Sequence, residues 1–139
     1  MYNKGINGGD CVAFEWTSRK PTEGIATLYA SNITLNKSAS SHFERAYNVL
    51  LGLDRENKRI AIKPITKQEV ERGAIPEEKR HKITVRPSYA RVCNKKFIKE
   101  AAQAAMIDLK ENNAVKFKTL WSPEHHALII ELSEIKGEL

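Results

Sequence analysis

The sequence lacks the features that define several classes of protein. Its two cysteines, Cys11 and Cys93, are too far apart for a CxxC pair, so we expect ordinary thiols, with a redox or pairing role as the alternative. No run approaches the roughly 18 consecutive apolar residues that a membrane helix needs. Residues 1–10 contain three glycines and no apolar core of a signal peptide. We therefore expect a cytoplasmic protein that does not enter a membrane.

Motifs that carry chemistry are also missing. The early glycines precede every predicted strand, which excludes a phosphate-binding loop between a strand and a helix. His125 and His126 follow Glu124, but adjacent histidines on a strand point to opposite faces and cannot share a metal ion. His42 lies near serines without an orienting acid. We expect no enzyme, metal or cofactor; an enzyme built from convergent residues is the alternative.

The composition is that of an ordinary folded protein. Hydrophobic residues make up 41% and charged residues 29% of the 139 residues, far from the composition of disordered chains. This length suits one domain. We expect a flexible leader over 1–10 and a single α+β domain over 11–139.

Patterns along the chain predict the elements of this domain. Alternating or β-branched apolar residues predict strands at 12–16, at 25–35 with a bend at 31–32, in a hairpin over 47–65, near 83–86 and 91–93, and in a hairpin over 115–132. Ser41 with Glu44, and Thr66 with Glu69, fit capping boxes that begin short helices. Asn94 is expected to cap a helix whose apolar stripe reaches Leu109 and supplies much of the core.

The two halves of the chain resemble one another. Asn-Lys pairs at 36–37 and 94–95 precede the two main helices, and hairpins of equal length follow at 48–65 and 115–132. In this alignment Leu50 matches Phe117 and Ile62 matches Ile129. Two strand-helix-hairpin repeats, over about 25–65 and 82–132, are therefore predicted; the alternative is that any two such segments look partly alike. We expect a mainly antiparallel sheet with two helices on one face.

The segment 33–64 carries a family resemblance. It reads I-T-L-N-K, then a short helix, then V-L-L-G-L-D and R-I-A-I-K-P. This order of strand, short helix and hairpin is similar to the swapped-hairpin DNA-binding domains of AbrB- and MraZ-type bacterial regulators. The overall duplication resembles the TATA-box-binding fold, in which two repeats form one saddle-shaped sheet. Both resemblances imply DNA binding.

Positive charge is concentrated in one segment. The net charge is +6, and residues 79–99 contain no Asp or Glu. Their basic residues are Lys79, Arg80, Lys82, Arg86, Arg91, Lys95, Lys96 and Lys99. Cations that neutralise phosphates release condensed counterions and thereby bind nucleic acid. Tyr89 lies among them, either to stack on a base or to cover the core.

Two functions follow from this charge distribution. The first is non-enzymatic nucleic-acid binding, in a regulatory or accessory role, through the eight cations. The second is a protein-interaction or structural module of a bacterial or phage assembly, with a homo-oligomer or another protein as partner. In that case the basic run is a solvated face balanced by Glu77, Glu78 or Glu100. One uninterrupted positive surface favours nucleic acid, whereas cations paired with carboxylates favour assembly.

Overall fold

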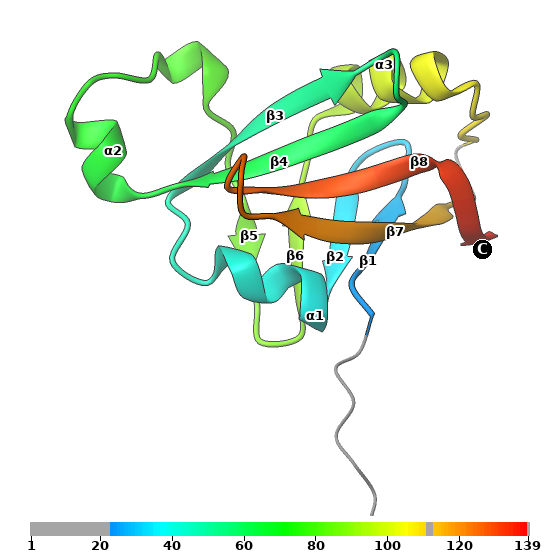
Figure 1. Ribbon diagram of the computed structural model, residues 1–139, viewed down its shortest axis with the longest axis horizontal. Coiled ribbons are helices and arrows are strands. Elements are labelled where there is room, and N and C mark those ends of the chain that lie inside the picture. The colour runs from blue at the N-terminus through cyan, green and yellow to red at the C-terminus, as the bar shows by residue number, and fades with distance from the viewer. Residues whose placement is uncertain (1–22, 111–112, 139) are drawn as a thin grey trace, which may run out of the picture.

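The computed structural model describes residues 23–110 and 113–138. The predicted leader over 1–10 and the predicted strand over 12–16 lie outside these residues. Within the described residues, eight strands form one sheet (Figure 1). The strands are β1 (Ile25–Leu28), β2 (Ile33–Asn36), β3 (Asn48–Asp54), β4 (Arg59–Ile65), β5 (Thr84–Val85), β6 (Tyr89–Val92), β7 (Val115–Ser122) and β8 (Ala127–Glu138).

The sheet is antiparallel at every pair of neighbours, which confirms the predicted mainly antiparallel α+β class. Its strand order is β3-β4-β8-β7-β1-β2-β6-β5. The sheet curls until its two ends meet, because Val49 of β3 exchanges two backbone hydrogen bonds of 2.9 Å with His81, just before β5. This contact covers part of the β3 edge.

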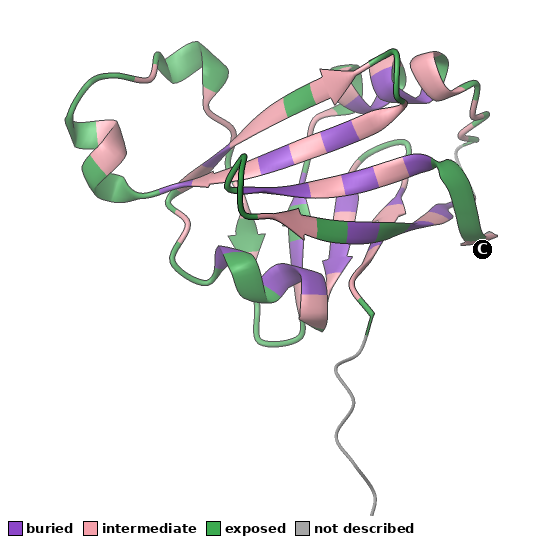
Figure 2. Cartoon of the chain, viewed as in Figure 1, coloured by how far each residue is buried: buried purple, intermediate pink, exposed green. Residues whose placement is uncertain are grey.

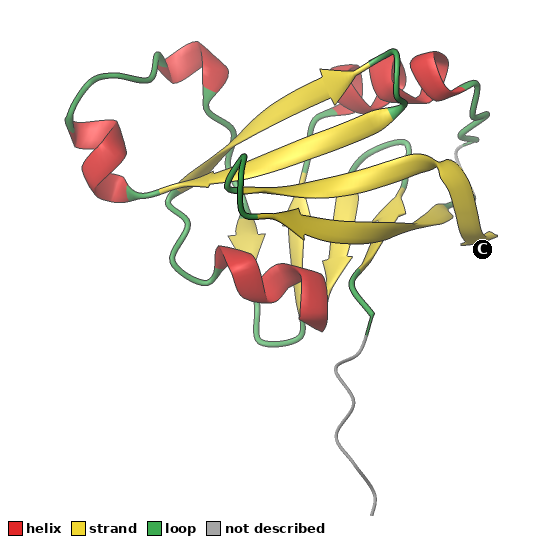
Figure 3. Cartoon of the chain, in the orientation of Figure 1, coloured by secondary structure: helices red, strands yellow, loops and turns green. Residues whose placement is uncertain are grey.

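Short helices connect the strands (Figure 3). They are α1 (Lys37–Ser40), α2 (Lys67–Glu71) and α3 (Lys95–Ala105), with 3₁₀ turns over Ser41–Phe43 and Glu77–Lys79. Thr66 and Glu69 form the predicted capping box of α2. The predicted cap at Ser41 is wrong: the helix begins earlier, where the Asn36 side chain accepts a 3.0 Å hydrogen bond from the Ala39 backbone.

Helix α3 begins where the sequence predicted and ends earlier. The Asn94 side chain accepts a 3.0 Å hydrogen bond from the Phe97 backbone, which confirms the cap. The helix stops at Ala105 because Met106 adopts a left-handed backbone with φ of 58° and leaves the apolar stripe, 87% exposed. It therefore buries only Ile98, Ala101 and Ala102.

Helices α1 and α3 lie at different ends of the sheet, and both contribute to one core, through Ala39 of α1 and Ile98 of α3. Strands β2 and β6 are antiparallel neighbours, and each leads directly into a helix, α1 and α3 respectively. Two antiparallel neighbours have their C-terminal ends at opposite ends of the sheet. The two helices therefore leave the sheet at opposite ends (Figure 1). Most of the core comes from the concave side of the curled sheet, where buried residues alternate along the strands (Figure 2).

Two of the strands differ in detail from their predictions. The run 25–35 is a hairpin of β1 and β2 rather than one bent strand, closed by a 2.8 Å hydrogen bond from Tyr29 N–H to Asn32 O. Pro64, which was expected to end pairing, ends it only with β8: β4 pairs with β8 up to Ile62 and with β3 up to Ile65.

The two long hairpins align one residue away from the predicted match. Asp54 pairs with Arg59 around one turn, and Ser122 pairs with Ala127 around the other. The last turn residue has a positive φ in both, 55° at Lys58 and 50° at His126. The predicted match of Leu50 with Phe117 is therefore wrong, because Leu50 is half-buried whereas Phe117 is fully buried.

Candidate nucleic-acid interface

A row of polar and basic residues crosses five strands on the outer side of the sheet. Each residue pairs directly with the next: Lys116 of β7, Thr27 of β1, Thr34 of β2, Arg91 of β6 and Thr84 of β5. Successive strand residues point to opposite sides. Because the strand neighbours Ala26, Leu35 and Ala90 are buried, this row faces outward.

A second row runs beside the first. Lys118 pairs with Ile25, whose backbone N–H donates a 3.1 Å hydrogen bond to the Asn36 side chain. Asn36 pairs with Tyr89, whose carbonyl accepts a 2.8 Å hydrogen bond from the Arg86 backbone. We call the outward residues of these two rows the basic sheet face; they are Ile25, Thr27, Thr34, Asn36, Thr84, Arg86, Tyr89, Arg91, Lys116 and Lys118.

The basic sheet face contains four cations and no carboxylate of its own; one of the four, Arg86, also lines a hollow with Lys37 and Glu44 beside α1. Among the described residues, none of these cations lies within 4.0 Å of an Asp or Glu oxygen. Glu23, next to the start of β1, is ion-paired with Lys136 at 3.4 Å. The Arg91 guanidinium lies 5.1 Å from the centre of the Tyr89 ring. Tyr89 is thus half-buried under Arg91.

The eight predicted cations do not form one surface. Only Arg86 and Arg91 lie on the basic sheet face. Lys95 and Lys99 line a hollow of about 360 Å³ with Ala30 of the β1–β2 turn, at one end of that face. Lys96 is exposed on α3.

The remaining three cations lie toward β3. Arg80 donates a 3.1 Å hydrogen bond from Nη1 to the Asn48 side chain, and its buried Nε finds no acceptor among the described residues. Lys79 lines a hollow over β3 and β4. Lys82 is exposed between the His81 bridge and β5. The run of basic residues in the sequence is therefore divided between different parts of the molecule.

Sequence reasoning missed Lys116 and Lys118. The alternation V-K-F-K-T indicates that both lysines share one side of a strand. Nothing local indicates that this strand reaches the basic segment, because β1 and β2 lie between β7 and β6. The sequence therefore indicated that the two lysines share one side of a strand. It did not indicate which strands lie beside that strand.

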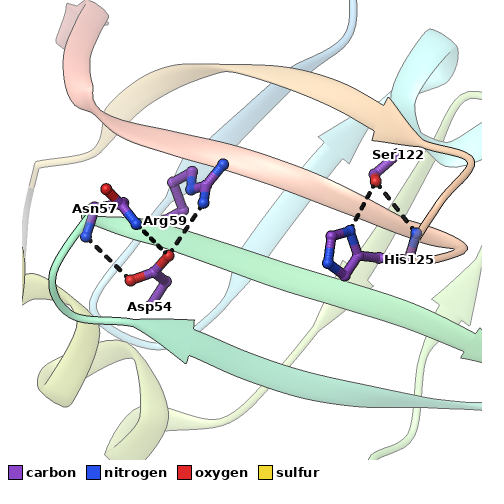
Figure 4. A network of polar contacts seen from close by, with 5 residues as sticks. All are labelled: Asp54, Asn57, Arg59, Ser122 and His125. Atoms are coloured by element: carbon purple, nitrogen blue, oxygen red, sulfur yellow. Dashed lines mark hydrogen bonds and ion pairs between the residues drawn. The ribbon is translucent and has the colours of Figure 1, made fainter.

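Two polar clusters lie at hairpin turns outside the basic sheet face (Figure 4). Asp54 accepts hydrogen bonds from the side chain of Asn57 at 2.9 Å, from the Asn57 backbone at 3.0 Å and from Arg59 at 3.1 Å. The Asn57 donors, followed by Arg59, lower the pKa of Asp54 from 3.8 to about 2. This arrangement closes the β3–β4 turn.

The second cluster pairs a serine with a histidine. Ser122 Oγ lies 3.1 Å from His125 Nδ1 and accepts a 3.3 Å hydrogen bond from the His125 backbone (Figure 4). A serine nucleophile also needs a group that orients the imidazole and donors for an oxyanion. Among the described residues no other side chain hydrogen-bonds the His125 imidazole or the Ser122 hydroxyl, and Lys63 reaches only the His125 carbonyl. The contact therefore closes the β7–β8 turn.

Trp121 lies between two histidines at one end of the sheet. The His42 ring stacks on it, with centroids 4.4 Å apart and planes 6° apart, and His126 meets it edge-on at 5.1 Å. The stacked Trp121 ring excludes water from one side of the His42 ring. This desolvation lowers the pKa of His42 below 6.5.

The lowered pKa of His42 predicts a small loss of stability in acid. In the unfolded chain His42 becomes protonated below about pH 6.5. In the folded chain it becomes protonated only at a lower pH, because its pKa is lowered. The contribution of His42 is therefore complete above pH 6.5 and declines as the pH falls through the folded pKa. Denaturant unfolding at about pH 7.5 and 5.5 should show a smaller acid loss for His42→Phe, which retains an aromatic ring. An equal loss in both proteins contradicts the prediction.

The described residues contain no group of three or more His, Cys, Asp or Glu side chains with metal-binding geometry. In the same part of the chain, no helix combines the length and apolarity required to cross a bilayer. Compared with known proteins, the chain matches no family model, no curated protein and no solved structure.

Proposed function

We propose that this protein binds nucleic acid through the basic sheet face, as a non-enzymatic regulatory or accessory protein. The observation that carries the proposal is that Arg86, Arg91, Lys116 and Lys118 share one outward surface without a carboxylate partner among the described residues. Such cations remain free to neutralise phosphates.

The groups between the cations suit the same ligand. Threonines at 27, 34 and 84 lie in one row with Lys116 and Arg91. Hydroxyl groups donate hydrogen bonds to phosphate oxygens, and arginine binds phosphate through two parallel N–H groups. Lys95 and Lys99 add positive charge beside the β1–β2 turn, in a hollow that Asp108 also lines.

A duplicated unit also forms part of the proposal. Exchanging β1–β4 with β5–β8 leaves every strand next to the same neighbours, provided that the Val49–His81 bridge counts as a neighbour contact. Asn36 and Asn94 cap the helices that follow β2 and β6. These correspondences support two repeats over about 25–65 and 82–132, and the resemblance of 33–64 to swapped-hairpin DNA-binding domains points the same way.

Binding should depend on the basic sheet face and on salt. We expect a labelled mixed-sequence duplex of about 20 base pairs to bind at about 50 mM salt and to weaken strongly at about 200 mM. Each phosphate contact adds about 0.9 to the slope of log affinity against log salt, so Arg91→Gln with Lys116→Gln should reduce that slope by about two. Fluorescence anisotropy with duplex and single strand measures both quantities.

A variant with the same change in net charge separates local contacts from overall charge. Lys67→Gln with Arg72→Gln removes two exposed cations from around α2 and should leave the slope nearly unchanged. The proposal fails if neither nucleic acid binds at low salt. It also fails if both double variants weaken binding equally, because attraction would then follow net charge alone.

A further inference from the structure

A hollow lies over the outer side of β3 and β4, away from the basic sheet face. Gly52 and Ala61 pair directly and form its floor, together with Leu50 and Ala127. Small side chains here leave space that larger residues would fill. The hollow has a volume of about 610 Å³, within the range of roughly 300–1,000 Å³ that small-molecule sites occupy.

The rim of this hollow is basic. Lys63 of β4, Lys79 of the 3₁₀ turn, His81 of the bridge and His125 of the β7–β8 turn all line it, against a single carboxylate, Glu78. No ion pair within 4.0 Å involves Lys63 or Lys79 in residues 23–110 and 113–138. Two lysines and two histidines thus converge from four separate parts of the chain around the apolar floor.

The rim groups retain free donors. Lys63 donates one hydrogen bond of 2.9 Å from Nζ to the His125 carbonyl, and an ammonium group has three donors. His81 Nδ1 lies 3.3 Å from Asn94 Nδ2, which is a donor because Asn94 Oδ1 accepts from the Phe97 backbone. The neutral His81 ring therefore carries its proton on Nε2. Lys63 and His81 can each donate further.

We propose that this β3–β4 hollow binds a small organic anion. Lys63 and Lys79 hold its carboxylate or phosphate group, and its apolar body lies over Gly52 and Ala61. A second hollow of about 450 Å³ shares Gly52, Ala61 and His125 with the first and extends toward Leu120. Asp54, Glu124 and Glu131 also line this second hollow, so only an uncharged part of the ligand can extend across the sheet toward β7.

The proposal is tested by titrating the full chain with phenyl phosphate, benzoate and the uncharged analogue benzyl alcohol. Amide chemical shifts in nuclear magnetic resonance spectra should move at Gly52, Ala61 and Lys63 with the two anions and much less with the alcohol. Lys63→Gln with Lys79→Gln should weaken anion binding about tenfold, the effect of losing charge-assisted hydrogen bonds. The preference between phenyl phosphate and benzoate identifies the anionic group.

Two further variants keep the result interpretable. Ala61→Leu fills the floor without changing charge and should weaken both anions, whereas Lys67→Gln with Arg72→Gln should bind as the unchanged protein does. The proposal is overturned if benzyl alcohol binds as well as the anions. It is also overturned if the shifts fall on the basic sheet face, or if Ala61→Leu leaves anion binding intact.

Discussion

Truncating Phe117 to alanine should lower the free energy of unfolding by about 3–5 kcal/mol, the largest effect that we expect from a single substitution. Phe117 is fully buried, at 0% exposure. Its strand pairs with β1 through Ala26 and with β8 through Ile135. Because β7 is held from both sides, the backbone cannot close the cavity that the missing ring leaves. Denaturant unfolding with an unchanged m-value measures the loss.

Leu120→Ala is the matched control for this experiment. Leu120 lies on the same strand and is 61% exposed. Its truncation should change stability by no more than about 0.5 kcal/mol, as surface substitutions usually do. Similar losses at Leu120 and Phe117 would mean that Phe117 does not fill the core in the way that its burial indicates.

The hairpins were the part of the fold most accessible to prediction. Five polar residues over 54–58 separate two apolar runs, which is a local signal for a turn. Their alignment with the second hairpin was not accessible, because it depends on the positive φ of Lys58 and His126. A shift of one residue exchanges the two faces of a strand. That is why Leu50 was matched with Phe117, although the two differ in burial.

The β1–β2 hairpin shows a different limit. Residues 25–35 are rich in β-branched and apolar side chains, and the turn at 29–32 contains neither glycine nor proline. β-propensity alone therefore favours one continuous strand. The hairpin forms because β1 pairs with β7 on one side and β2 pairs with β6 on the other. These partners lie far along the chain, so only the complete sheet determines where the strand ends.

The candidate interface combines residues that the local sequence indicates with residues that only the order of the strands brings together. Arg86 and Arg91 were identified because they belong to a run of cations in the sequence. Lys116 and Lys118 join them only through the row of pairs that crosses β1 and β2. Conversely, Arg80 bonds to Asn48 at the start of β3 although its sequence neighbours are basic. A run of charges in the sequence identifies only cations that are close together along the chain. The order of the strands determines which cations share a surface.

Gly24→Ala should destabilise the protein by about 1–3 kcal/mol, the range typical of overpacked sites. The Gly24 carbonyl accepts a 3.0 Å hydrogen bond from the Thr119 backbone, which holds these two segments of the chain close together. A Cβ at Gly24 would overlap Thr119 Oγ1. Thr119 is only 8% exposed and β-branched, so its side chain has little room to turn away.

A double-mutant cycle tests this cause directly. Thr119→Ala removes the overlapping atom, so Gly24→Ala should cost much less in that background, as coupled neighbours do. Gly137→Ala is the control, because its Cβ would meet Lys116 Cδ at an ordinary 3.9 Å. It should cause little or no loss in thermal unfolding. If Gly24→Ala is equally costly with and without Thr119→Ala, the close approach of these two residues is not what requires glycine at position 24.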